Sequence, residues 1–143
     1  MQAFICVTCA VQQSPTDDPP AHCPICEDER QYVRQGGQKW TTLEELAAAS
    51  HRIEVRELEP DLYGVGVTPP VAIGQRALLV RTPRGNLLWD CTGYIDAAGI
   101  EAVRALGGIA AIAFSHPHFY GVMVEWSRAF GACPIYIPSA DRQ

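Results

Sequence analysis

Four of the six cysteines stand in two closely spaced pairs near the N-terminus, Cys6 with Cys9 and Cys23 with Cys26. Two residues separate the members of each pair, and thirteen residues separate the pairs, which lets the chain turn back on itself. Four thiolates that converge in this way form the tetrahedral donor set of closed structural zinc sites. We therefore expect these cysteines to bind a structural zinc ion. A redox-active pair, an iron site and four unligated thiols are the alternatives.

A second pair of potential metal ligands, His116 and His118, follows the apolar run 109–114. That run contains no polar residue and predicts a strand buried on both sides. Open α/β sheets bind ligands at the carboxyl ends of their strands, and two histidines spaced two apart in an extended chain point the same way. The pair could therefore bind one cation, the alternative being two polar loop histidines. His22 is expected to be a surface residue rather than a ligand.

The elements that must position these residues fall into two parts. Residues 1–40 form a small module that cannot bury enough apolar surface to fold without a metal or a larger neighbour. Residues 41–143 alternate strands and helices as in an α/β layered domain. Helices are expected at 43–50, 97–106 and 122–130, and strands at 52–58, 62–67, 77–82, 87–90, 109–114 and 134–137. Thr42, in a capping box with Glu45, and Asp96 are expected to cap the first two helices.

Composition limits the classes of partner and location. Hydrophobic residues make up 48% of the chain and charged residues 19%, as in ordinary globular proteins. The net charge of −5 disfavours nucleic-acid binding, which depends on Lys and Arg neutralising phosphates. The sequence opens without a secretory pattern, and no apolar run approaches the roughly 18 residues that span a bilayer. We therefore expect a cytoplasmic protein with no membrane or nucleic-acid partner and with reduced cysteines.

Residues from about 62 to 138 resemble the N-terminal half of the metallo-β-lactamase fold superfamily. The predicted hairpin ends in Asp90-Cys91-Thr92-Gly93, similar to the family's Asp-x-x-Gly, and Ser115-His116-Pro117-His118 matches the start of its His-x-His-x-Asp-His loop. The resemblance implies an α/β fold, the N-terminal half of an αββα sandwich, joined here to a four-cysteine zinc ribbon. It also implies that His116 and His118 bind a catalytic zinc or other divalent ion, and that Asp90 supports the loop from behind.

The sequence departs from that family in two ways. Tyr120 and Gly121 stand where the family has the Asp and His that help to bind a second metal. Glycine offers no ligand, and a phenol with a pKa of about 10 is a poor one at neutral pH. In addition, the family has a second half that supplies the remaining ligands. We therefore expect a mononuclear site, in a truncated chain or in a half-fold that pairs with a missing C-terminal half or with another copy.

The resemblance implies a metal-dependent hydrolase that acts on an ester, thioester or related bond of a small-molecule substrate and is impaired in this 143-residue chain. Asp90 would orient the loop, and Tyr120 would either stand near the substrate or pack against the helix 122–130. The alternative function is a non-catalytic binding or scaffolding protein with a zinc ribbon and a decayed active site. Cys91 and Cys133 are expected to be buried cysteines rather than nucleophiles.

Overall fold

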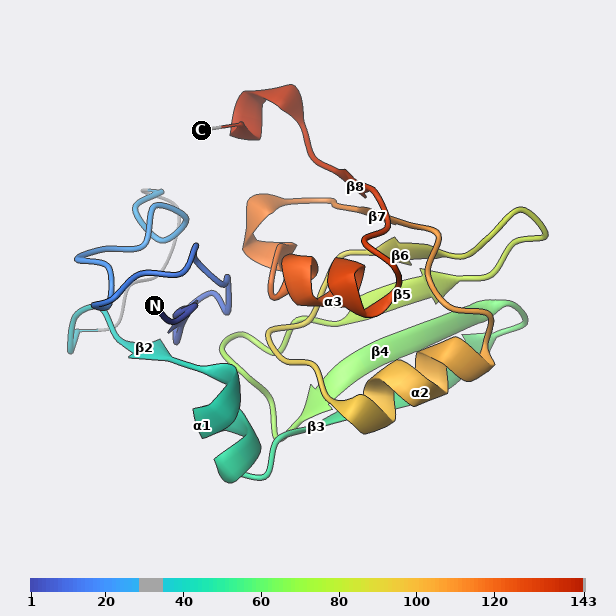
Figure 1. Ribbon diagram of the computed structural model, residues 1–143, viewed down its shortest axis with the longest axis horizontal. Coiled ribbons are helices and arrows are strands. Elements are labelled where there is room, and N and C mark those ends of the chain that lie inside the picture. Colours follow the sequence, from blue (N-terminus) through green and yellow to red (C-terminus); the bar gives the residue numbers. More distant parts are fainter. Residues whose placement is uncertain (29–34, 143) are drawn as a thin grey trace.

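The computed structural model describes residues 1–28 and 35–142. The described residues form a six-stranded sheet with helices on one face, and a cysteine-bearing N-terminal segment lies beside this layer pair (Figure 1). The mixed α/β architecture predicted from the sequence is confirmed. The predicted module 1–40 includes residues 29–34, which lie outside the described residues.

The sheet of the described chain has the strand order β3-β4-β5-β6-β7-β8. The pairs from β3 to β6 are antiparallel, whereas β6, β7 and β8 are parallel. The strands are β3 (Arg52–Glu59), β4 (Leu62–Thr68), β5 (Ala77–Val80), β6 (Leu87–Trp89), β7 (Ala111–Ala113) and β8 (Ile135–Tyr136). Because β6 and β7 are parallel, their carboxyl ends lie at one edge, where Asp90 and Ser115 follow directly.

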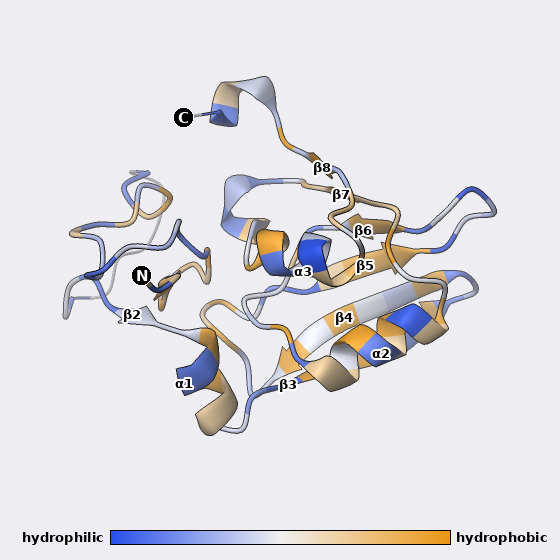
Figure 2. Ribbon diagram, viewed as in Figure 1, coloured by the Kyte–Doolittle hydropathy of each residue, from blue (hydrophilic) through white to orange (hydrophobic). Residues whose placement is uncertain are grey.

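Two helices, α2 (Ala97–Ala105) and α3 (Met123–Ala129), lie over the same face of the sheet (Figure 1). The strand residues that point toward them include Leu79, Leu88 and Ile112, which pair across neighbouring strands and are all fully buried. Hydrophobic residues are concentrated on these strands, while α2 alternates hydrophobic and hydrophilic residues (Figure 2). This face therefore forms the main core of the protein.

The opposite face of the sheet is less covered. Trp89 and Tyr136 lie on it in register with Ala113, and their side chains are 37% and 62% exposed. The prediction that the strand within 109–114 is buried on both sides is therefore wrong, since Ala111 and Ala113 are only half-buried. The physical reason is that α2 and α3 both pack on the other face.

The N-terminal segment packs on the domain through a continuous core. Its two-residue strands β1 (Ile5–Cys6) and β2 (Trp40–Thr41) pair with each other. The short helix α1 (Leu43–Ala48) follows β2. Ile5 and the cysteines belong to the same buried cluster as Leu79 and Ile112 of the sheet. Among residues 1–28 and 35–142, no helix has the length and apolar character that a bilayer span requires.

Both predicted helix caps are present. The Thr42 hydroxyl accepts a hydrogen bond from the amide of Glu45 at 3.2 Å. The predicted return bond of the capping box takes a different form, because the Glu45 carboxylate accepts from the hydroxyl of Thr41 at 2.9 Å. Asp96 does more than cap α2: one carboxylate oxygen accepts from the amide of Gly99 at 2.6 Å and the other from the amide of Ile53 at 2.9 Å. It therefore ties β3 to α2.

Two substitutions of Asp96 distinguish how much each of its hydrogen bonds, from Gly99 and from Ile53, contributes to stability. Asp96→Ala removes both acceptors and is expected to lower the free energy of unfolding by about 2 kcal/mol. Asp96→Asn keeps one oxygen for Gly99 but turns an amide group toward the amide of Ile53, so a loss of about 1 kcal/mol is expected. Urea denaturation at fixed zinc concentration measures both values. Equal stability of the two variants would contradict the dual role.

Candidate metal centre and histidine loop

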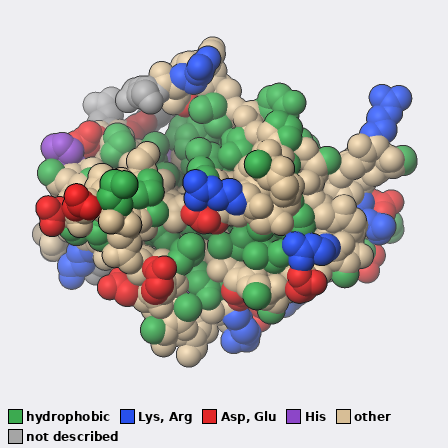
Figure 3. All heavy atoms as spheres, in the orientation of Figure 1, with side chains coloured by type: hydrophobic (Ala, Val, Ile, Leu, Met, Phe, Trp, Pro, Cys, Tyr) green, Lys and Arg blue, Asp and Glu red, His purple; other side chains and the backbone are tan. Residues whose placement is uncertain are grey.

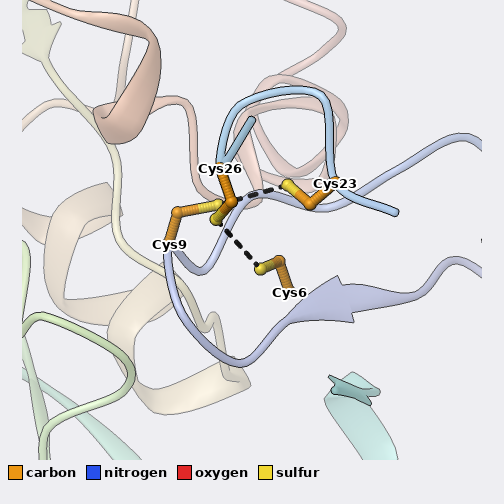
Figure 4. Close-up of side chains that lie close together, drawn as sticks. All are labelled: Cys6, Cys9, Cys23 and Cys26. Atoms are coloured by element: carbon orange, nitrogen blue, oxygen red, sulfur yellow. Dashed lines mark hydrogen bonds between the residues drawn. The ribbon is translucent and has the colours of Figure 1, made fainter. Parts of the chain in front are cut away.

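The four cysteines of the N-terminal segment converge on one point (Figure 4). Their Sγ atoms all lie within 4.8 Å of one another, with 3.6 Å between Cys6 and Cys26 and 3.7 Å between Cys9 and Cys23. A tetrahedral four-thiolate zinc site with bonds of about 2.3 Å places its sulfur atoms about 3.8 Å apart. All four side chains are buried. The donor set and its spacing therefore fit a metal such as zinc.

Tight turns present the sulfur atoms of this cluster. The amide of Ala10 donates to the carbonyl of Cys6 at 2.8 Å, and the amide of Cys26 donates to the carbonyl of Cys23 at 3.0 Å. His22, as predicted, is a surface residue, with a side chain that is 73% exposed. The prediction that His22 is not a member of the cysteine cluster is therefore confirmed.

The pKa of Cys6 is shifted in the opposite direction to the pKa values of Cys9, Cys23 and Cys26, which are raised. Hydrogen bonds from Cys23 and Cys9 lower the pKa of Cys6, whose sulfur also accepts from the amide of Thr8 and the side chain of Gln38. Burial raises the pKa of Cys26 to about 12. Several thiolates packed so closely in a buried site need a compensating positive charge. A divalent cation bound by the four sulfur atoms would supply that charge.

The histidine loop begins at the carboxyl end of β7 and is held by Asp90 at the end of β6. The Asp90 carboxylate accepts hydrogen bonds from the amide of Ser115 at 2.8 Å and from its hydroxyl at 2.9 Å. Asp90 is buried and has a φ of 65°, a left-handed conformation that Asp tolerates better than most residues. The placement of Asp90 beside the loop matches the resemblance, while its functional role stays a prediction.

The two histidines of the loop lie against each other, but in a different backbone conformation from the expected one. Pro117–Phe119 forms a short 3-10 helix, so the His-x-His segment is not extended. The Nδ1 of His116 accepts from the amide of His118 at 3.2 Å and lies 2.9 Å from the Nδ1 of His118. The stacked rings are 4.7 Å apart. Two nitrogens on one tetrahedral zinc are about 3.3 Å apart, so the two Nδ1 atoms are near enough to share an ion only if their mutual contact and the bond from the His118 amide are replaced.

Among the residues that the structure describes, no third His, Cys, Asp or Glu side chain lies close enough to His116 and His118 to bind the same ion. Within residues 1–28 and 35–142, the four cysteines are the group of three or more His, Cys, Asp or Glu side chains that could hold one ion. His116 and His118 therefore supply two nitrogens, whereas catalytic zinc sites use about three protein ligands and one water.

Tyr120 and Gly121 have structural roles at the end of the loop. The Tyr120 hydroxyl donates to Asp141 at 2.8 Å, its ring packs edge-on against Phe114, and burial raises its pKa above the ordinary value. Gly121 has a φ of 48°, and a Cβ at this position would collide with the carbonyl oxygen of Thr92. A histidine at position 121 would be incompatible with this close approach of the two backbones.

The chain offers a matched test of this close approach. Gly121→Ala combines a positive φ with the collision and should lower the free energy of unfolding by about 3 kcal/mol. Gly131→Ala also has a positive φ, of 75°, but its Cβ would enter open space, so a loss of about 1 kcal/mol is expected. Equal losses in urea denaturation would show that the contact with Thr92 is unimportant.

Cys91 and Cys133 are buried, as predicted. Burial, followed by the nearby Asp90, raises the pKa of Cys91 well above that of a free thiol, and burial also raises the pKa of Cys133. A raised pKa lowers the thiolate fraction at neutral pH, and the thiolate is the nucleophilic form. These thiols are therefore poorly suited to nucleophilic catalysis.

Alkylation of the folded protein measures the reactivity of Cys91 and Cys133. In the folded, zinc-loaded protein at pH 7.5, iodoacetamide is expected to leave Cys91 and Cys133 unmodified, and modification should increase only toward a pH above their raised pKa values. Peptide mapping measures the extent, and the same protein in urea gives full modification as the control. Rapid alkylation of Cys91 in the folded protein would contradict the assignment.

Gln75 is a site residue that the sequence did not single out. It lies in the loop between β4 and β5, and its Nε2 donates to the carbonyl of Cys9 at 2.6 Å and to the carbonyl of His118 at 2.8 Å. No motif marks it, because both partners are backbone atoms distant in sequence. It joins the cysteine segment to the histidine loop.

Comparison with known proteins gives a relative without a described activity. No family model matches the chain. The chain is 47% identical over 144 residues to "Uncharacterized protein YmaE" of Bacillus subtilis (strain 168). The similarity covers 100% of this chain and 52% of YmaE, so the chain spans about half the length of this curated relative.

Proposed function

We propose that this chain is the N-terminal half of a metal-dependent hydrolase of the metallo-β-lactamase-like type, carrying a zinc ribbon. The observation that supports this most is the arrangement at the carboxyl edge of the sheet. There Asp90, at the end of β6, binds Ser115 through both carboxylate oxygens and so fixes the start of the His116-Pro117-His118 loop. Ligand sites of open α/β sheets occupy this edge.

The cysteine cluster is assigned a structural zinc ion. Four soft sulfur donors at tetrahedral spacing suit zinc, and they fill all four positions, so no position remains for a substrate or a reactive water. The segment before α1 is also too short to bury a core of its own. The zinc ion would therefore stabilise the fold rather than take part in the reaction.

The histidine loop is assigned the catalytic metal, zinc or another divalent ion. Such an ion lowers the pKa of a bound water toward neutrality and polarises the carbonyl or phosphoryl group under attack. The chain's own residues would bind and orient: His116 and His118 provide imidazole nitrogens, and Asp90 holds the loop through Ser115. Tyr120 is oriented toward Asp141, which suits a packing role better than contact with substrate.

A complete catalytic site needs ligands in addition to these two histidines. We propose that they come from a second half of a longer protein or from a second copy of this chain. The half-length match to YmaE supports the first source. The substrate would be a small molecule with an ester, thioester or related bond.

A non-catalytic scaffold is the second candidate function. Two observations favour it: Gly121 is closed off by Thr92, and Tyr120 is bonded to Asp141, so both positions of the family's second metal serve packing. On the face shown in Figure 3, Lys and Arg side chains are scattered among acidic ones, and the absence of a nucleic-acid partner remains a prediction.

The metal content of the purified chain distinguishes the two functions. Native mass spectrometry of the zinc-loaded chain is expected to show two metal ions, with one remaining in the His116→Ala, His118→Ala double variant. The matched control is His22→Ala, His51→Ala, which changes the other two histidines of the chain and should retain both ions.

One ion in the unchanged chain as well as in both double variants would refute the hydrolase proposal and favour the scaffold. Where two ions are found, the residual hydrolysis of a generic thioester by this impaired chain should fall at least tenfold in the His116→Ala, His118→Ala variant and not in the control.

A further inference from the structure

Gln75 has an unusual position between the two groups of potential metal ligands. Its side chain is 6% exposed and approaches two carbonyl oxygens, those of Cys9 and His118. The atom that faces two acceptors must be the amide nitrogen, so both of its hydrogens are used and the orientation of the amide is fixed. The Oε1 atom is buried without a hydrogen-bond partner among the described residues. Packing alone would not select a side chain with such an unsatisfied acceptor.

Two other contacts connect the same segments. The amide of Gln12 donates to the carbonyl of Gly121 at 3.0 Å, at the far end of the histidine loop. Ala10 lies so close to Gly93 that a Cβ on Gly93 would collide with it. The chain from Cys9 to Gln12 therefore runs directly along the loop and along the segment after Asp90. Gln75 provides the side-chain link at the centre of this contact.

We propose that Gln75 is a positioning residue that couples the two sites, so that a metal ion bound by the four cysteines fixes the position of His118 and hence of the histidine pair. The coupling would pass through a continuous series of contacts. A metal bond to the Cys9 sulfur restricts Cys9, the Cys9 carbonyl holds the Gln75 amide, and the amide holds the His118 carbonyl. The inference rests on the metal-binding role proposed above for the cysteines.

The position of the histidine loop is set by contacts from several segments of the chain. Its 3-10 helix has only three residues, and Asp90 holds the loop only at Ser115. The end that carries His118 is held by three contacts: the Gln75 side chain donates to the His118 carbonyl, the Cys91 amide donates to the Phe119 carbonyl at 2.9 Å, and the Gln12 amide donates to the Gly121 carbonyl. Of these, the bonds of Gln75 and Gln12 connect the loop to the cysteine-bearing segment. Thermodynamic coupling is reciprocal, so an ion at the histidines would strengthen metal binding at the cysteines by the same factor.

Hydrogen exchange of the loop amides tests the proposal. The full chain is compared with one equivalent of zinc and after removal of zinc by EDTA, with occupancy followed by native mass spectrometry. Zinc removal is expected to speed exchange at Phe119 and Tyr120 on the order of tenfold, within the usual range of allosteric coupling. The amide of Ser115, held by Asp90, should change little and serves as the internal reference.

Variants isolate the Gln75 link. Gln75→Met keeps the size of the side chain and removes both donors, so fast loop exchange is expected even with zinc at the cysteines. The matched control is Gln12→Leu, since Gln12 contacts the loop through its backbone amide and should behave as the unchanged chain.

Unaltered loop exchange after zinc removal would overturn the proposal, as would exchange in Gln75→Met identical to that of the control. Loss of protection spread evenly over β4 and β5 would also overturn it, because the effect would not be local. The unchanged chain alone provides this test where Gln75→Met does not fold. The readout does not require a metal on the histidines, so failure of the proposed hydrolytic site is scored separately by its metal content.

Discussion

The convergence of four buried sulfur atoms is the constraint from which the rest of the arrangement follows. Cys6, Cys9, Cys23 and Cys26 come from two tight turns on a segment with few strand residues, and their sulfur atoms lie within 4.8 Å of one another. As thiolates they would form the donor set of a closed tetrahedral metal site, whose cation would balance their charge. The same segment presents the Cys9 carbonyl and the Gln12 amide to the domain. The segment that carries the candidate metal site therefore packs directly against the histidine loop.

Close backbone contact explains why the loop departs from the pattern it resembles. At Gly121 the chain approaches the Thr92 carbonyl so tightly that no side chain fits. At Tyr120 the hydroxyl is used by Asp141. These two positions are therefore not vacant ligand positions in an otherwise open site. They are built into the packing between the loop and the segment that follows β6, which limits the histidine loop to the two imidazoles of His116 and His118.

Local signals in the sequence predicted much of the fold. Thr42 and Asp96 mark their helices because a short acceptor before an apolar turn satisfies free amides, and this chemistry needs no distant partner. The spacing of the cysteines is also a local signal, because each pair lies on one tight turn that presents both of its sulfur atoms. The strand β7 shows the limit: the apolar run 109–114 that contains it does not reveal that α2 and α3 lie on one face of the sheet. Gln75 could not be predicted, because its partners are backbone carbonyls at positions 9 and 118, which only the fold brings together.

The loop is thus supported from two sides by different kinds of interaction. On the sheet side, Asp90 binds Ser115 with both oxygens, and its own amide is held by the Ala113 carbonyl, so this support belongs to the rigid parallel part of the sheet. On the N-terminal side, support passes through Gln75 to a segment whose order depends on its cysteines. The three-residue helix between these supports is also held at Phe119, whose carbonyl accepts from the amide of Cys91 at 2.9 Å. Of the two histidines, His118 is the one whose backbone carbonyl contacts Gln75, so we expect its position to depend on the cysteine-bearing segment more strongly than that of His116.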